Sequence, residues 1–290
     1  MRVKTLFLLV LVLALLLAGC ATQPAATPTA TEAVVATTEM VPTTPTSPPS
    51  QAVDLNVFAA ASLTEPFGEL GKMFEADHPG AKVVYNFAGS QQLAQQINQG
   101  APADVFASAN KAQMNAVIQA GGIVSGTQQT FAKNRLVVII PKDNPAGLKE
   151  LKDLANPGLK LILAAKEVPV GGYSLDFLDK ATADPAFGAA FKDEVLKNVV
   201  SYEDNVKSVL TKVALGEADA GIVYSSDISG QDAGKVGRLD IPDALNVIAS
   251  YPIAPVKESK NPDLAQAFID LVLSQKGQEI LAKYHFIPVK

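Results

Sequence analysis

The sequence has one cysteine, no tryptophan and two histidines among its 290 residues. A single cysteine excludes a disulfide within the chain. The two histidines stand apart, with no cysteine or carboxylate at the spacing of metal ligands, so the pattern does not predict a zinc site. Lysine and arginine number 24 against 29 for aspartate and glutamate, and the net charge of −5 argues against a general nucleic-acid binder, which needs a basic face.

The first 50 residues have the pattern of an export signal followed by a spacer. An almost unbroken apolar run, Leu6 to Leu17, follows a basic start and is short for a membrane span, which is typical of a signal peptide. The segment ends in Leu17-Ala18-Gly19-Cys20, which resembles a bacterial lipobox. We therefore predict that Cys20 carries a lipid and anchors the chain to the outer face of the cell membrane, in a periplasm or at a cell surface. Residues 21–50 are mostly Thr, Pro, Ala and Ser and predict a disordered tether.

From residue 51 onward, strand-like and helix-like segments alternate. Strands are expected at 53–60, 82–88, 104–108, 135–141, 159–164, 199–202 and 220–224, with an extended crossing segment at 247–253. Helices are expected at 64–77, 91–98, 111–120, 172–182, 186–196, 205–215, 261–273 and 276–284. Such alternation predicts parallel sheets with helices on both faces. One sheet of this length would be large, so we expect two lobes, with the chain crossing between them near 131–135 and 250–253.

Three of the predicted strands end in a short turn that leads directly into a helix. Ser62 and Ser90 lie in the first two of these turns, Val206 falls in the first turn of the third of these helices, and a fourth strand ends at Tyr224. Ser62 with Glu65 three residues later has the form of a capping box. At this point each serine is interpreted either as a cap of its own helix or as a donor to a ligand.

Ligands of open α/β sheets bind beyond the carboxyl ends of the strands, which is where these groups lie. Together they offer hydroxyl and backbone N–H donors without an arginine or a lysine. Such a set suits a small, fully ionised oxyanion, because a protonated anion such as hydrogen phosphate also needs an acceptor. Asp204, an expected helix N-cap beside Val206, stays open as such an acceptor or as a cap that faces solvent.

Four runs of residues resemble the molybdate-binding ModA family, the substrate-binding proteins of molybdate ABC importers. They are Phe58-Ala59-Ala60-Ala61-Ser62-Leu63, Gly100-Ala101-Pro102-Ala103-Asp104-Val105-Phe106, Glu203-Asp204-Asn205-Val206 and Gly221-Ile222-Val223-Tyr224-Ser225-Ser226-Asp227. They occur in the family's order, and the resemblance covers essentially all of 52–290. It implies an α/β, two-lobed periplasmic-binding-protein fold of type II, in which each lobe is a mainly parallel sheet flanked by helices.

The resemblance also implies a ligand site. The binding groups are the hydroxyls of Ser62, Ser90 and Tyr224 and the backbone N–H groups of Val170 and Val206. Val170 is included because it takes the place of the alanine in the Val-Pro-Ala-Gly turn of the family, which is Val168-Pro169-Val170-Gly171 in this sequence. Molybdenum or tungsten would be held as its oxyanion, with no side chain bound to the metal, and neither a cofactor nor a catalytic residue is expected.

The implied role is extracytoplasmic capture of molybdate or tungstate by closure of the lobes, and delivery to an ABC permease with its cytoplasmic ATPase. We expect a monomer that binds no nucleic acid. The expected organisation is a signal peptide at 1–20, the tether at 21–50, lobe 1 from 51–132 and 253–290, and lobe 2 from 133–252. The sequence does not choose between molybdate and tungstate.

Two alternatives stay open. The first is a receptor for another small oxyanion, such as sulfate or phosphate, on the same fold. The second is an exported hydrolase on a two-lobed scaffold. The sequence has no Gly-x-x-x-x-Gly-Lys run to cradle a nucleotide phosphate and no Gly-x-Ser-x-Gly turn for a nucleophilic serine, so we predict that the protein is not an enzyme.

Overall fold

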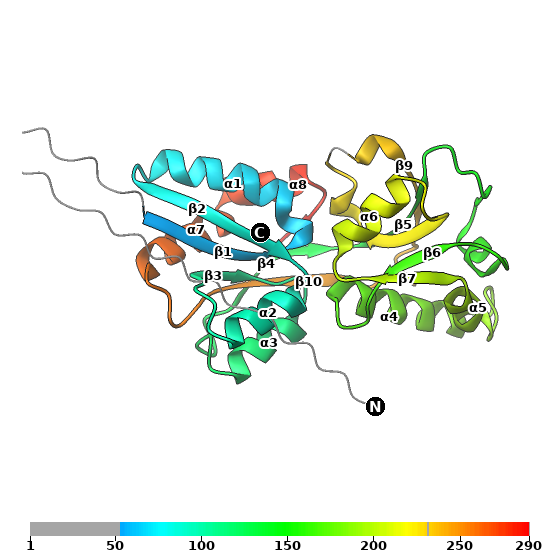
Figure 1. Cartoon of the computed structure of the whole chain (residues 1–290), viewed down its shortest axis with the longest axis horizontal. Coiled ribbons are helices and arrows are strands. Elements are labelled where there is room, and N and C mark those ends of the chain that lie inside the picture. The colour runs from blue at the N-terminus through cyan, green and yellow to red at the C-terminus, as the bar shows by residue number, and fades with distance from the viewer. Residues whose placement is uncertain (1–52, 231, 290) are drawn as a thin grey trace, which may run out of the picture. The chain divides into compact units, whose positions relative to one another are not determined.

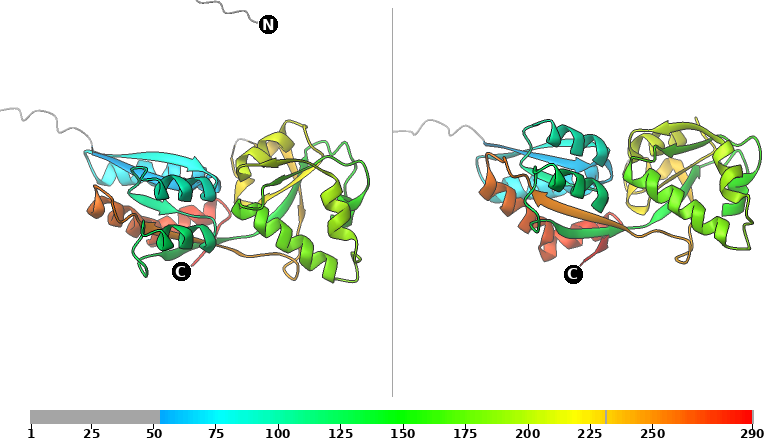
Figure 2. Two further views of the ribbon diagram at one scale, coloured as in Figure 1. Left: turned by 60° about the horizontal axis from the view of Figure 1, so that its bottom comes forward. Right: turned by 90° about the horizontal axis from the view of Figure 1, so that it is seen from below.

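The computed structural model describes residues 53–230 and 232–289. The predicted signal peptide, the lipidation site Cys20 and the tether therefore lie outside the described residues. Within the described part, the chain forms two β-sheets flanked by helices (Figures 1 and 2). None of the helices described there is long and apolar enough to cross a membrane.

The first sheet has the strand order β11-β4-β10-β3-β1-β2. Its strands are β1 (Val53–Ala60), β2 (Ala81–Ala88), β3 (Val105–Ala107), β4 (Gln129–Asn134), β10 (Ala249–Pro255) and β11 (Ile287–Pro288). Its helices are α1 (Thr64–Asp77), α2 (Ser90–Asn98), α3 (Lys111–Gln119), α7 (Pro262–Leu273) and α8 (Gln275–Lys283). We call this sheet with its helices lobe 1.

The second sheet has the strand order β7-β6-β8-β5-β9. Its strands are β5 (Leu136–Pro141), β6 (Leu161–Ala164), β7 (Val199–Glu203), β8 (Ala220–Tyr224) and β9 (Val236–Asp240). The helices here are α4 (Pro169–Ala183), α5 (Phe191–Lys197) and α6 (Val206–Ala214), and short 3-10 segments occur at η1 (Ala61–Leu63, in lobe 1), η2 (Leu151–Ala155), η3 (Ser225–Asp227) and η4 (Ala233–Lys235). We call the second sheet with its helices lobe 2.

Helices cover both faces of the lobe 1 sheet because successive side chains of a strand point to opposite faces. In β1, Leu55, Val57 and Ala59 belong to the core shared with α1, α7 and α8, whereas Phe58 packs into a separate core with α2 and α3. The helix predicted at 64–77 is confirmed as α1: Phe67 and Phe74 are fully buried, and their rings meet the ring of Phe268 of α7 edge-on. This packing fixes the start of α1, and with it the turn that follows β1.

The sheets are mixed, so the prediction of mainly parallel sheets needs correction. Pairing is parallel in β2-β1-β3 and in β7-β6-β8, but antiparallel where β10 and β5 join their sheets. The chain leaves lobe 1 at the end of β4, enters lobe 2 as β5 and returns as β10. A strand that enters one lobe from the other lobe begins at the interface and runs away from it. Its direction is therefore opposite to that of the strands whose carboxyl ends point toward the interface.

Most predicted elements are confirmed, with small shifts at their ends. β1, α1 and β8 begin and end as predicted, but the strands β4, β9 and β11 were not predicted as strands. The first helix of lobe 2 begins earlier than predicted, at Pro169. Proline suits the first position of a helix because the missing N–H has no partner there in any case. Val170 thus lies in the first turn of α4.

Candidate functional site

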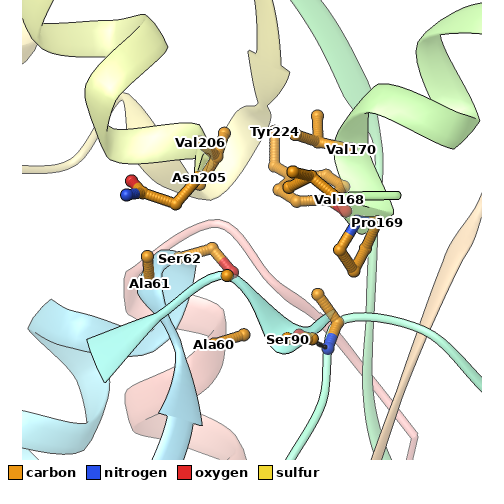
Figure 3. Close-up of a pocket in the computed structure, with 12 residues that line it drawn as sticks. Ala60, Ala61, Ser62, Ser90, Val168, Pro169, Val170, Asn205, Val206 and Tyr224 are labelled. Carbon is orange, nitrogen blue, oxygen red and sulfur yellow. Dashed lines mark hydrogen bonds between the residues drawn. The ribbon is translucent and has the colours of Figure 1, made fainter. Parts of the chain in front are cut away.

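A small cavity lies where helix starts from the two lobes meet (Figure 3). The space open to the centre of a water molecule is about 10 Å³, close to what a single water requires. The structure brings all five predicted site residues to its wall. The lining residues are Ala60, Ala61, Ser62, Gly89, Ser90 and Ala109 from lobe 1, and Val168, Pro169, Val170, Asn205, Val206 and Tyr224 from lobe 2.

Each predicted site residue occupies the junction of a strand and a helix. Ser62 lies in η1 directly after β1, Ser90 begins α2 and Val206 begins α6. Val170 is in the first turn of α4, and Tyr224 ends β8. First-turn N–H groups have no partner within their own helix and carry the positive end of its dipole. The cavity therefore collects N–H groups and hydroxyls from four helix starts.

Ser62 does not form the predicted capping box. Its Oγ is 3.0 Å from the hydroxyl of Tyr251, and no side chain caps η1 or α1. Glu65, the expected partner in the box, instead accepts from Lys207 of lobe 2. Of the two interpretations of Ser62, the helix cap is wrong, because contacts with residues distant in the sequence replace the local pairing. These contacts leave the Ser62 hydroxyl beside the cavity.

Ser90 is also not a helix cap. Gly89 takes the N-cap position, and the Ser90 Oγ accepts from the backbone N–H of Ala109 at 3.0 Å. A hydroxyl has one proton and can accept as well as donate. The N–H of Ala109 takes up one acceptor position of the Ser90 oxygen, and no acceptor for the Ser90 proton is found among the described residues, so that proton is available for a ligand.

The hydroxyl of Tyr224 is a buried polar group of the site that lacks a hydrogen-bond partner among the described residues. The side chain is 1% exposed. Burial raises the pKa of Tyr224 well above its usual value, so the hydroxyl stays protonated and is a donor. A buried polar group without a partner is unusual in native proteins, and here it faces the place where a ligand would bind.

The N-cap of α6 is Asn205 rather than the predicted Asp204. The Asn205 side chain accepts from the backbone N–H of Ser208 at 3.0 Å, while the Asp204 side chain is exposed and does not line the cavity. Asn205 stands one position nearer the first helical residue, which is where a side-chain oxygen can reach the third N–H. Among the described residues, no charged side chain lines the cavity.

Polar contacts join the two lobes around the cavity. Lys207 Nζ lies 2.9 and 2.8 Å from the two carboxylate oxygens of Glu65. Gln91 Nε2 donates to the carbonyl of Asp204 at 2.9 Å, and Gln113 Nε2 donates to the carbonyl of Glu167 at 3.2 Å. These contacts could not be predicted from local sequence patterns, because the partners lie 54 to 142 residues apart along the chain.

A buried carboxylate lies behind this interface. Asp227 is fully buried, its Oδ2 accepts from the backbone N–H of Tyr224 at 2.9 Å, and its Oδ1 is 3.7 Å from Lys207 Nζ. Burial raises the pKa of Asp227 to about 6, against the attraction of Lys207. Asp227 therefore holds the backbone of Tyr224 and links it to the contact between the lobes.

The chemistry of the cavity is that of a donor cage. It offers three hydroxyls and helix-start N–H groups, all neutral, and they converge from both lobes. Neutral dipoles of this kind bind anions without a counter-charge. In the described part of the chain, no three His, Cys, Asp or Glu residues are grouped so as to hold a metal ion directly.

Several known proteins resemble this chain over most of its length. Residues 55–287 match the family model of the bacterial extracellular solute-binding proteins. The molybdate-binding protein ModA of Mycobacterium tuberculosis is 39% identical over 242 residues, which cover 83% of this chain and 87% of that protein. ModA of Escherichia coli is 32% identical over 238 residues, covering 80% and 88%.

A solved structure shows the same fold. The periplasmic molybdate-binding protein of Azotobacter vinelandii superposes with a TM-score of 0.69 at 21% identity, over 81% of this chain and all of that one. The two-lobed α/β architecture is thus that of periplasmic binding proteins. The chain belongs to the bacterial extracellular solute-binding proteins and, among them, to the family of the molybdate-binding protein ModA.

Proposed function

We propose that this protein binds molybdate or tungstate outside the cytoplasm and delivers it to an ABC-type importer. The observation that carries the proposal is the cavity itself, where donors from both lobes converge and no charged side chain intrudes. The relatives named as molybdate-binding proteins support this choice of ligand. The proposed binding groups are the hydroxyls of Ser62, Ser90 and Tyr224 and the N–H groups of Val170 and Val206.

The proposed mechanism is closure of the lobes on the anion. Residues 51–132 with 253–290 would move against 133–252, hinged where the chain crosses between the sheets. The donors replace the hydration shell of the anion, and the anion supplies the partner that the Tyr224 hydroxyl lacks among the described residues. The membrane permease, powered by its ATPase, would then recognise the closed form.

A rigid cage of donors also discriminates by size. Sulfate is smaller than molybdate, so donors that reach molybdate would be stretched around sulfate. Each buried hydrogen bond left unmade costs roughly 1–3 kcal/mol. A protonated anion is rejected for a different reason, because Asp204 lies outside the cavity and supplies no acceptor to it.

The protein in this proposal is a monomer that is tethered to the membrane and is not an enzyme. Lipid on Cys20 would hold the chain at the outer face of the cell membrane, with residues 21–50 as the spacer. Mass spectrometry of membrane-extracted protein would show acylation at Cys20, and Cys20→Ser should release the protein into the soluble fraction. A Cys20→Ser variant that stays in the membrane would contradict the anchor.

Calorimetric titration of the purified protein with molybdate, tungstate, sulfate and hydrogen phosphate tests the ligand. We expect tight binding of molybdate and tungstate and much weaker binding of the other two. Equal affinity for sulfate and molybdate would favour the general oxyanion receptor instead. Absence of binding to all four would overturn the proposal.

A further inference from the structure

We propose that Tyr251 and Asn134, neither of which lines the cavity, fix the direction of the hydrogen bond at Ser62, so that this serine donates to the bound anion and cannot accept from it. They would thus be positioning residues that determine specificity. The inference rests on the proposed function, since it concerns how the same site selects its anion. It starts from a chain of buried hydrogen bonds that runs from the crossing strands to the cavity.

The chain begins at Asn134, the last residue of β4, which is fully buried. The backbone N–H of Arg135 donates to Asn134 Oδ1 at 2.9 Å, and the Ser225 hydroxyl donates to the same oxygen at 3.0 Å. A backbone N–H can only donate, so this contact identifies Oδ1 and orients the amide. The opposite side of the amide is therefore the NH₂ group.

The amide NH₂ of Asn134 faces two hydroxyls. It donates to Ser226 Oγ at 2.8 Å and to the Tyr251 hydroxyl at a longer 3.5 Å. Tyr251, in β10, is fully buried, and burial raises its pKa well above the usual value, so its hydroxyl keeps its proton. Because Asn134 can only donate there, the Tyr251 oxygen accepts from it and its proton points elsewhere.

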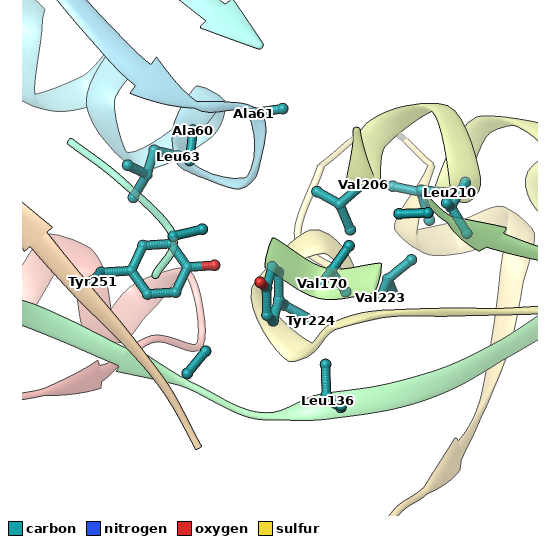
Figure 4. Packing of buried hydrophobic residues seen from close by; sticks show 14 of the residues in the cluster. Ala60, Ala61, Leu63, Leu136, Val170, Val206, Leu210, Val223, Tyr224 and Tyr251 are labelled. Atoms are coloured by element: carbon teal, nitrogen blue, oxygen red, sulfur yellow. The ribbon is translucent and has the colours of Figure 1, made fainter. Parts of the chain in front are cut away.

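The Tyr251 proton then goes to Ser62, whose oxygen lies 3.0 Å away. Figure 4 shows that the Tyr251 hydroxyl also faces that of Tyr224, but the Tyr224 hydroxyl has no partner at hydrogen-bond distance among the described residues, which leaves Ser62 as the acceptor. Ser62 then accepts from Tyr251, and its own single proton is left for the cavity. The order of donation runs from Asn134 to Tyr251, from Tyr251 to Ser62, and from Ser62 to the anion.

Ser90 is also fixed as a donor toward the cavity, but by a backbone group instead of a side chain. Its oxygen accepts from the N–H of Ala109, and a backbone group cannot reverse its role. At Ser62 the partner is a hydroxyl, which can donate or accept, so the direction depends on Asn134 behind it. An anion that carries a proton needs an acceptor for that proton. A Ser62 hydroxyl that is fixed as a donor cannot act as this acceptor. The residues behind Ser62 thus enforce selection of fully ionised anions.

A double-mutant cycle tests this coupling. The probe is whichever of molybdate, tungstate, sulfate and hydrogen phosphate the wild-type protein binds most tightly. Tyr251→Phe should weaken binding about fivefold to twentyfold. In a Ser62→Ala background the same change should have less than about a twofold effect, because the residue through which Tyr251 acts is gone. Equal effects in the two backgrounds would overturn the proposal.

The matched control is Tyr85→Phe. Tyr85 is also a tyrosine of lobe 1 with a hydrogen-bonded hydroxyl, which donates to the carbonyl of Phe67 away from the cavity. Its loss should leave the affinity unchanged. If Tyr251→Phe does not fold, the cycle is run with Asn134→Ser, which removes the amide donor and leaves Tyr251 in place.

A change of specificity separates this role from a merely structural one. At mildly alkaline pH, where phosphate keeps one proton, Tyr251→Phe should raise the affinity for hydrogen phosphate relative to the best anion, since Ser62 is then free to accept. An unchanged ratio contradicts the proposal. If the wild type binds none of the four anions, the proposed function fails as well; if it binds one but the cycle is additive, only the role of Tyr251 fails.

Discussion

Lys207 of α6 lies 2.8 Å from a carboxylate oxygen of Glu65 in lobe 1 and 3.7 Å from the buried carboxylate of Asp227 in lobe 2. One cation is thus shared between a contact that exists only while the lobes are together and a contact within lobe 2. Asp227 in turn accepts from the backbone of Tyr224. The interface between the lobes and the candidate ligand site are therefore held by one set of polar contacts.

Glu65→Gln should weaken anion binding about twofold to fivefold by speeding dissociation. The change keeps the size of the side chain but removes the negative charge of the ion pair between Glu65 and Lys207. The two side chains of this pair are each about a quarter exposed. A partly exposed pair contributes up to about 1 kcal/mol, which corresponds to this change in affinity. Stopped-flow dissociation and calorimetry measure the effect.

Glu69→Gln is the control for this prediction. Glu69 lies on the same helix, but its carboxylate accepts from Lys283 and Tyr284 of lobe 1. Its loss should leave dissociation unchanged. If Glu65→Gln and Glu69→Gln behave alike, the contact between the lobes does not stabilise the bound state.

Asp227 should make stability fall as the pH rises through about 4 to 6. Burial raises its pKa from the usual 3.8 to about 6, so in this range the folded protein binds more protons than the unfolded chain. The contribution is fully present below the ordinary pKa and is lost as the pH passes the raised one. A shift of about two units corresponds to about 3 kcal/mol. Asp227→Asn, which keeps an oxygen for the Tyr224 N–H, should remove this part of the pH dependence.

Chemical unfolding of the wild type and Asp227→Asn across this pH range provides the test. The difference between the two proteins isolates Asp227 from carboxylates whose pKa is lowered, such as Asp153, where backbone N–H donors favour the ionised form. The gap in unfolding free energy should change by a few kcal/mol over the window. Parallel curves would mean that Asp227 does not titrate in it.

The sequence predicted what depends on neighbours along the chain. A strand, a small turn and a helix start are local patterns, so the positions of Ser90, Val206 and Tyr224 beyond the strand ends were predictable. The place of Val170 came from the family resemblance, because the helix start at Pro169 was not recognised.

The partners of these groups were not predictable in this way. Tyr251 meets Ser62 across 189 residues, and Lys207 meets Glu65 across 142. The periodicity of a sequence does not predict such distant pairs. Here the two pairs replace the capping box between Ser62 and Glu65 that the local sequence suggested. The sequence therefore predicted which residues reach the cavity but not how their hydroxyls are oriented.

Tyr224→Phe should weaken anion binding about tenfold without lowering the stability of the unliganded protein. The hydroxyl has no partner among the described residues, so its removal breaks no hydrogen bond within them and relieves the desolvation of a buried polar group. Calorimetry and thermal unfolding without ligand measure the two effects. A clear loss of stability would show that the hydroxyl has a structural partner.

Ser90→Ala should lower both the affinity and the stability. Its oxygen accepts from the backbone N–H of Ala109, and a buried N–H left without an acceptor costs roughly 1–3 kcal/mol. The same two measurements apply, and the contrast with Tyr224→Phe is the informative result. Equal stability of the two variants would indicate that the Ala109 N–H finds another acceptor.

Gly171→Ala should disrupt the start of α4 and, with it, anion binding. A Cβ at this position would overlap the carbonyl oxygens of Ala165 and Ala164, so the first helical turn must shift. Overpacking of this kind costs typically 1–3 kcal/mol, more than alanine gains over glycine in a helix. Since Val170 immediately precedes Gly171, its N–H moves away from the cavity, and we expect at least a tenfold loss of affinity.

Gly172→Ala provides the comparison, because a Cβ there would approach only the Lys166 carbonyl oxygen, at 3.3 Å. This variant should keep its affinity and its unfolding temperature within a few degrees of the wild type. Calorimetry of the two alanine variants then tests the least direct part of the proposed site. If Gly171→Ala loses stability but binds the anion normally, the start of α4 does not contribute to binding, and the donor cage consists of the other three helix starts and Tyr224.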